Sequence, residues 1–189
     1  MKDRLLPIGK TIAALALIVV LTNSAAFARE FDPKLPPSKA EWQHFHKMSE
    51  SDLTKLWTYQ HQRGSKKLAD WSWQWRMGWL QRCGLNGMET ICPKILLEGL
   101  NDQAMVIRAE AATHLGMRFA GKATPELIYA LQKTYMDPRN ARNGNPLFVC
   151  ERILEALKNL KDPRATKVAK NLAKRHSETK AYWAKIQKK

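Results

Sequence analysis

Residues 97–116, LEGLNDQAMVIRAEAATHLG, contain the pattern that decides the fold class of this chain. Asn101 and Asp102 are turn-forming residues that separate two apolar runs. After this turn, apolar or small residues recur at alternating spacings of four and three, the spacing of one face of an α-helix. They are Met105, Ala109, Ala112, Gly116 and Phe119, with Ile107, Ala111 and Leu115 widening the same face. The stretch therefore predicts two helices joined by a tight turn.

Helix-start signals recur through the rest of residues 38–189. Ser38-Lys39-Ala40-Glu41 has the pattern of a capping box, and proline follows a capping residue at Thr124-Pro125 and at Asp162-Pro163. No segment shows the alternating apolar pattern of a strand. We therefore expect an all-α domain of about eight helices, in which Ser177 either restarts a helix or bends it. The remaining expected helices cover about residues 49–63, 66–82, 92–100, 104–119 and 147–160.

Two helices per unit repeat with a period of about forty residues. Leu115 and Leu157 occupy matching helix positions 42 residues apart. Over residues 92–175 the chain resembles HEAT-repeat proteins of the PBS-lyase-like kind. The matching residues are Asn101-Asp102, Val106-Ile107-Arg108, Ala111-Ala112 and Leu115-Gly116.

The second unit departs from the family pattern. Cys150 stands where the arginine of the repeat is expected, and residues 137–146 form an insertion. The resemblance implies a short solenoid of stacked helix pairs with a binding surface, and it implies no catalytic residues. Residues 38–83 are expected to form an N-terminal helical cap, and residues 176–189 a basic tail.

The N-terminus has the three parts of a cleavable signal peptide within residues 1–28. Basic residues lie at positions 2, 4 and 10, an apolar run covers residues 11–22, and Ala26-Phe27-Ala28 provides small residues around a cleavage point. The apolar run is shorter than the ~20 residues of a membrane-spanning helix. We expect a periplasmic or secreted protein without a transmembrane segment after processing, with a Pro-rich lead-in at residues 29–37. The alternative is an uncleaved N-terminal anchor.

Positive charge is concentrated near the C-terminus. The chain has 32 basic and 17 acidic residues, and eleven of the basic but two of the acidic residues lie in residues 158–189. Lys167, Lys170 and Lys174 share one helix face. This face is either simply solvated or a docking stripe for an anionic partner such as acidic polysaccharide or anionic lipid. Nucleic acid is not expected as a partner of an exported chain.

Four tryptophans lie within nine residues. On a continuous helix, Trp71, Trp75 and Trp79 share one face and Trp73 lies on the opposite face. Either both faces belong to the core, or one face is an exposed aromatic platform for a sugar, a peptide or a partner chain. In the second interpretation Arg76, Arg82 and Lys66 place cations at the edge of the platform.

The three cysteines allow one short-range pair. Cys83 and Cys92 flank a predicted loop, so we expect a disulfide between them in an oxidising compartment. The alternative is that all three cysteines are buried thiols. If Cys83 and Cys92 are paired, Cys150 is the odd cysteine and is either a core thiol or the source of an intermolecular disulfide.

The sequence contains no recognisable catalytic, cofactor-binding or metal-binding motif. His44 and His46 project in different directions from a helix, and Glu151 and Glu155 are not marked as an acid–base pair. We therefore predict a non-enzymatic scaffold or adaptor of the bacterial envelope that binds another protein. The alternatives are a binder of acidic envelope polymer or anionic membrane surface, and an enzyme or enzyme subunit whose site the sequence does not display.

Overall fold

The computed structural model describes residues 32–63, 67–84, 88–140 and 147–188. The predicted signal peptide, the first residues of the predicted lead-in, Lys66 and most of the predicted insertion at residues 137–146 lie outside these ranges. The described residues contain helices and no strand, which confirms the all-α prediction. The helices are α2 (Lys39–Lys47), α3 (Glu50–Arg63), the 3-10 helix η1 (Leu68–Asp70), α4 (Trp73–Gly84), α5 (Cys92–Gly99), α6 (Met105–Arg118), α7 (Pro125–Tyr135), α8 (Leu147–Asn159), α9 (Pro163–Ala173) and α10 (Ser177–Ile186).

The predicted capping residues begin their helices. Ser38 accepts a hydrogen bond from the Glu41 backbone, and the Glu41 side chain accepts one in return, which completes the capping box. Thr124 caps α7 and Asp162 caps α9 through their side-chain oxygens. Each cap satisfies backbone N–H groups that would otherwise lack a partner, at a gain of about 1 kcal/mol.

The predicted helix from Lys66 to Arg82 is wrong in its first half. Only a 3-10 turn forms at Leu68–Asp70, and α4 starts at Trp73. Ser72 interrupts the helix because its N–H donates to the Pro33 carbonyl oxygen at 2.7 Å, and its own carbonyl oxygen accepts from the Arg76 N–H. The Ser72 N–H is therefore bonded to the lead-in segment and not to a preceding turn of helix, so α4 does not extend towards Lys66.

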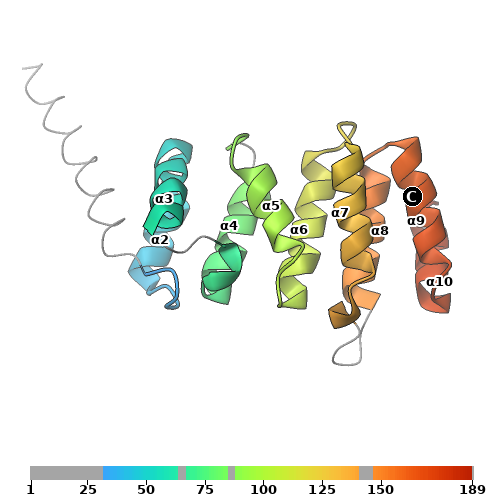
Figure 1. The fold of residues 1–189 in the computed structure, drawn as a ribbon, viewed down its shortest axis with the longest axis horizontal. Coiled ribbons are helices and arrows are strands. Elements are labelled where there is room, and N and C mark those ends of the chain that lie inside the picture. Colours follow the sequence, from blue (N-terminus) through green and yellow to red (C-terminus); the bar gives the residue numbers. More distant parts are fainter. Residues whose placement is uncertain (1–31, 64–66, 85–87, 141–146, 189) are drawn as a thin grey trace, which may run out of the picture.

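The helices stand side by side along the long axis of the molecule (Figure 1), with α2 and α3 at one end and α9 and α10 at the other. Helix α6 packs against α4, α5 and α8, and α8 packs against α6, α7, α9 and α10. The approach of α6 to α8 requires a small residue, because a Cβ atom at Gly116 would lie 2.5 Å from the Cα atom of Ala156. The buried residues form one hydrophobic cluster from Phe45 to Ile186.

Cys83 and Cys92 are joined as predicted. Their Cα atoms lie 5.2 Å apart, and the disulfide connects the end of α4 to the start of α5. Cys150 is a buried free cysteine, and burial raises the pKa of its thiol to about 11. Within the described residues, no helix combines the length and the apolar character needed to cross a membrane.

A buried polar network connects four segments of the fold. Arg76 of α4 donates from Nη1 to both carboxylate oxygens of Asp102, at 2.8 and 2.7 Å. Arg108 of α6 is fully buried and donates to the Asp102 carbonyl oxygen at 2.7 Å. Its Nε and Nη2 donate to Oδ1 of Asn140 at 3.0 and 2.8 Å, and the Asn140 amide donates to the Thr134 carbonyl oxygen. The network holds α4, the α5–α6 turn and the segment after α7 against α6.

Candidate binding surfaces

Three of the four clustered tryptophans belong to the core. Trp71, Trp75 and Trp79 are 3%, 1% and 0% exposed, so their indole rings are not available to a partner. Trp73 differs, with 54% of its surface exposed. Trp71, Trp75 and Trp79 are therefore core residues, and Trp73 is the one of the four that a partner could contact.

The buried tryptophans attach the N-terminal helices to the rest of the fold. The Phe45 ring of α2 lies 5.3 Å from the Trp75 ring and 5.1 Å from the Trp79 ring, both edge-on. The Trp57 ring of α3 lies 5.2 Å from Trp79 and 5.7 Å from Trp71. All of these pairs are edge-to-face except Trp57–Trp71, which is tilted, and edge-to-face aromatic pairs add about 0.5–1.5 kcal/mol each to the effect of burial.

The cations expected beside the tryptophans have structural partners instead. Arg76 is 5% exposed and is ion-paired with Asp102, so its guanidinium is not accessible to a partner. Arg82 donates to the carbonyl oxygens of Met48 and His46, which end α2. Lys66 lies outside the described residues. The sequence could not reveal these partners, because they lie 26 to 36 residues away from the arginines.

An uncharged hollow of about 150 Å³ lies beside Trp73. We call it the Trp73 hollow, and its lining residues are Pro37, Trp42, Trp73, Gln74, Met77 and Gln81. The Oε1 atom of Gln74 is buried and has no hydrogen-bond partner among the described residues. Sequence analysis found Trp73 but missed Pro37 and Trp42, since the lead-in and α2 come together with α4 only in the tertiary structure.

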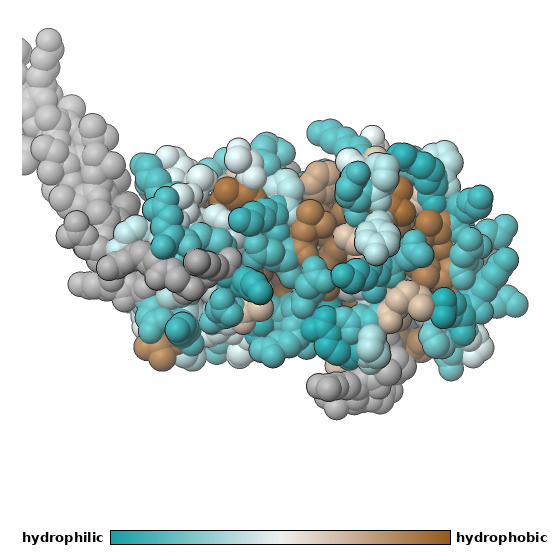
Figure 2. Space-filling view, viewed as in Figure 1, coloured by the Kyte–Doolittle hydropathy of each residue, from teal (hydrophilic) through white to brown (hydrophobic). Residues whose placement is uncertain are grey.

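Two lysines of α9 and the lysine that caps its C-terminal end are exposed. Lys167, Lys170 and Lys174 are exposed, whereas Ala165, Ala169 and Leu172 on the other side of α9 are buried. None of the ion pairs within the described ranges involves these lysines. Figure 2 shows a mainly hydrophilic surface at the end of the molecule formed by α9 and α10. We call Lys167, Lys170 and Lys174 the lysine stripe.

The two acidic residues within residues 158–189 already accept hydrogen bonds from other residues. Asp162 accepts from Arg164 at 2.7 Å, and this pairing, aided by backbone N–H groups, lowers the pKa of the carboxyl to about 2. Glu178 accepts from the Ser177 hydroxyl at 2.9 Å. The lysine stripe is therefore not neutralised by either of them.

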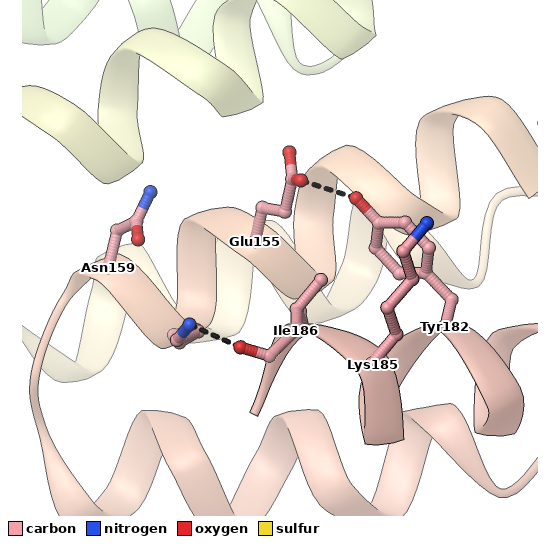
Figure 3. Close-up of a pocket in the computed structure, with 6 residues that line it drawn as sticks. Glu155, Asn159, Tyr182, Lys185 and Ile186 are labelled. Carbon is pink, nitrogen blue, oxygen red and sulfur yellow. Dashed lines mark hydrogen bonds between the residues drawn. The ribbon is translucent and has the colours of Figure 1, made fainter. Parts of the chain in front are cut away.

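A second hollow, of about 330 Å³, lies between α8 and α10 and was not predicted from the sequence. The α8–α10 hollow is lined by Glu155, Lys158, Asn159, Tyr182, Lys185 and Ile186 (Figure 3). Two hydrogen bonds connect α8 to α10 at this hollow. The Tyr182 hydroxyl donates to Glu155, and the Lys158 ammonium donates to the Ile186 carbonyl oxygen. Burial and the hydrogen bond to Glu155 raise the pKa of Tyr182 above its ordinary value.

No group of three or more histidine, cysteine, aspartate or glutamate side chains that could hold a metal ion is present in the described ranges. His114 lies 3.0 Å from Glu110 and forms a local pair within α6.

Comparisons with family models, with curated proteins and with solved structures find no match to this chain.

Proposed function

We propose that this chain is an exported, non-enzymatic adaptor of the bacterial envelope that binds another protein through the Trp73 hollow. The observation that carries the proposal is the exposure of Trp73. Its indole is 54% exposed beside an uncharged hollow, while the three neighbouring tryptophans are buried. The occupant of the hollow is an apolar side chain of the partner protein.

The chemistry of the hollow favours this occupant. Two indole rings, a methionine and a proline offer apolar contact area, and no charged side chain lines the hollow. Tryptophans in such settings are frequent anchors of protein–protein contacts. A volume of about 150 Å³ suits one side chain, since pockets for drug-sized molecules are typically larger, about 300–1,000 Å³.

We further propose a short HEAT-like solenoid as the scaffold. Two turns use aspartate in the same way: before α6, Oδ1 of Asp102 accepts from the Ala104 N–H, and before α9, Oδ1 of Asp162 accepts from the Arg164 N–H, both at 2.7 Å. Asp137 accepts from the Arg139 N–H at 2.8 Å in the same geometry. Stacked units of this kind bury a continuous core, as the packing of α6 between α4 and α8 does here.

Export is supported by two independent features. Residues 1–28 have the basic, apolar and small-residue parts of a signal peptide. The disulfide between Cys83 and Cys92 fits an oxidising compartment such as the periplasm.

The proposal is tested by affinity capture with the processed chain. Wild type, Trp73→Ala and Tyr129→Ala are immobilised, exposed to envelope extract and eluted with a salt gradient. Tyr129 is the matched control, because its ring is 66% exposed but does not line the Trp73 hollow. We expect one protein to stay bound beyond about 0.5 M salt on wild type and Tyr129→Ala, and to be lost from Trp73→Ala. Equal retention by Trp73→Ala, or no retained protein at all, contradicts the proposal.

A further inference from the structure

The basic charge of this protein is concentrated at the end opposite the Trp73 hollow. Residues 29–157 contain eighteen basic and fourteen acidic residues, whereas residues 158–189 contain eleven and two. The hollow lies on α2 and α4, and the lysine stripe lies on α9 at the far end of the row of helices (Figure 1). The two features can therefore act independently.

The lysine stripe is straight and regularly spaced. Its members lie three and four residues apart, on α9 and at the helical C-cap position Lys174, so they advance by about one turn each and cover roughly 10 Å along the helix axis. The opposite side of α9 is packed into the core through Ala165, Ala169 and Leu172. The three ammonium groups therefore project from a firmly held helix.

Helix α10 is held in place beside this stripe. The Tyr135 hydroxyl donates to the Leu172 carbonyl oxygen and lies 3.1 Å from the Thr179 hydroxyl, which ties α7 to α9 and α10. The contacts of Lys158 and Tyr182 tie α10 to α8. The backbone of α9 and α10, which carries these basic side chains, is therefore held in position by contacts with α7 and α8.

The α8–α10 hollow adds a cationic recess to this end. Lys185 and Asn159 provide an ammonium group and an amide to its lining. Glu155 also lines the hollow, but its carboxylate oxygens are occupied by Arg152 at 2.9 Å and by the Tyr182 hydroxyl. The carboxylate of Glu155, the acidic residue in the lining, is therefore already paired, and Glu151, which does not line the hollow, interacts electrostatically with Lys185.

We propose that this end binds a linear acidic polysaccharide with one carboxylate on each sugar unit. Successive carboxylates contact the lysine stripe, and the α8–α10 hollow takes an acidic unit where the polymer reaches it. A straight row of single positive charges matches a chain that carries negative charges at regular intervals. The interaction is electrostatic and depends on salt.

The described surface favours a polymer over a membrane or a nucleic acid. None of the exposed large apolar residues lies between 158 and 188, and helices that lie in a membrane interface insert an apolar face. Single-stranded nucleic acids stack on exposed aromatic rings, and the rings of Tyr182 and Trp183 are partly buried.

The test measures binding of the processed chain to alginate, a linear polyuronate, by titration calorimetry at about 0.05 M and about 0.3 M salt. The variant is Lys167→Gln/Lys170→Gln/Lys174→Gln. The matched control is Lys39→Gln/Lys47→Gln/Lys122→Gln, which removes the same charge from exposed positions elsewhere. We expect alginate to bind wild type and control at low salt, with binding at least about tenfold weaker in the stripe variant and a smaller salt dependence. Lys185→Gln should weaken binding by a smaller factor.

Three results overturn this inference. The first is no alginate binding at low salt, and the second is equal weakening in the stripe variant and the control. The third is tighter, stripe-dependent binding to phosphatidylglycerol vesicles or to a single-stranded oligonucleotide than to alginate. Trp73→Ala should leave alginate binding unchanged. The alginate experiment therefore tests this inference without testing the proposed protein contact at the Trp73 hollow.

Discussion

The guanidinium of Arg76 and the carboxylate of Asp102 form a buried ion pair, with 2.7 Å between Nη1 and Oδ2 and side chains 6% and 1% exposed. The pair connects α4 to the turn between α5 and α6. Asp102 also caps the Ala104 N–H, and its carbonyl oxygen accepts from Arg108. One residue of the turn thereby anchors two arginines from neighbouring helices.

Removing the carboxylate should destabilise the fold strongly. Asp102→Ala leaves the buried Arg76 cation without its partner and removes a helix cap, so we expect the free energy of unfolding to fall by about 3–5 kcal/mol. Urea denaturation followed by circular dichroism measures the change. Asp70→Asn, at an exposed position, is the control and should change stability by less than about 0.5 kcal/mol. A similar small change for both variants would show that the ion pair does not anchor the turn.

Two tryptophans of the same helix should respond in opposite ways to truncation. Trp75→Ala removes a ring that is 1% exposed and should lower the free energy of unfolding by about 3–5 kcal/mol. Trp73→Ala should change it by less than about 0.5 kcal/mol, because Trp73 is mainly exposed. Thermal and urea unfolding of the two variants provide the comparison. A large loss of stability in Trp73→Ala would place its ring in the core.

Gly116 tests the packing of α6 against α8. Helix propensity alone predicts that Gly116→Ala stabilises the chain by about 1 kcal/mol. The added Cβ atom, however, would lie 2.5 Å from the Ala156 backbone, so we expect a net destabilisation of about 1–3 kcal/mol. Stabilisation by the substitution, measured by urea unfolding, would mean that the two helices are not in close contact.

Cys150 should be unreactive in the native protein. Its thiol is buried and its pKa is raised to about 11, so only about a thousandth of it is thiolate at pH 8. We expect iodoacetamide to modify Cys150 in urea but not in buffer, as read by mass spectrometry. Rapid modification in buffer, or a disulfide-linked dimer on a non-reducing gel, would instead indicate an accessible thiol.

Because of the same thiol, the free energy of unfolding should fall as the pH rises in the alkaline range. Folding raises its pKa above the value of ~8.5 found in unfolded chains. The resulting stabilisation is complete below about pH 8.5 and is lost as the pH rises towards about 11. Cys150→Ala removes this contribution, so the difference in stability between the variant and wild type should shrink over that range.

Features that involve residues close together in the sequence could be predicted from the sequence. The caps at Ser38, Thr124 and Asp162 each involve backbone groups within three residues, so their patterns identify them directly. The pairing of Cys83 with Cys92 was predictable because the two residues lie nine positions apart.

Long-range contacts explain what the sequence did not reveal. The roles of Arg76 and Trp73 depend on which neighbours cover each face of α4, and both faces have the same apolar spacing. One available signal was missed, the repetition of Asp-Pro-Arg at 137–139 and 162–164. Arg139 and Arg164 each reach back to an earlier turn, at the carbonyl oxygens of Asn101 and Ala123.

Photo-crosslinking in living cells tests the central claim, a protein contact at the Trp73 hollow, most directly. The photoreactive amino acid p-benzoylphenylalanine replaces Gln81, an exposed residue that lines the hollow, so that Trp73 stays in place, or, as the control, Tyr129, which is exposed elsewhere. The proposal predicts a discrete crosslinked product between the chain and one envelope protein from position 81 and none from position 129. No product from position 81, or the same product from both positions, would contradict it.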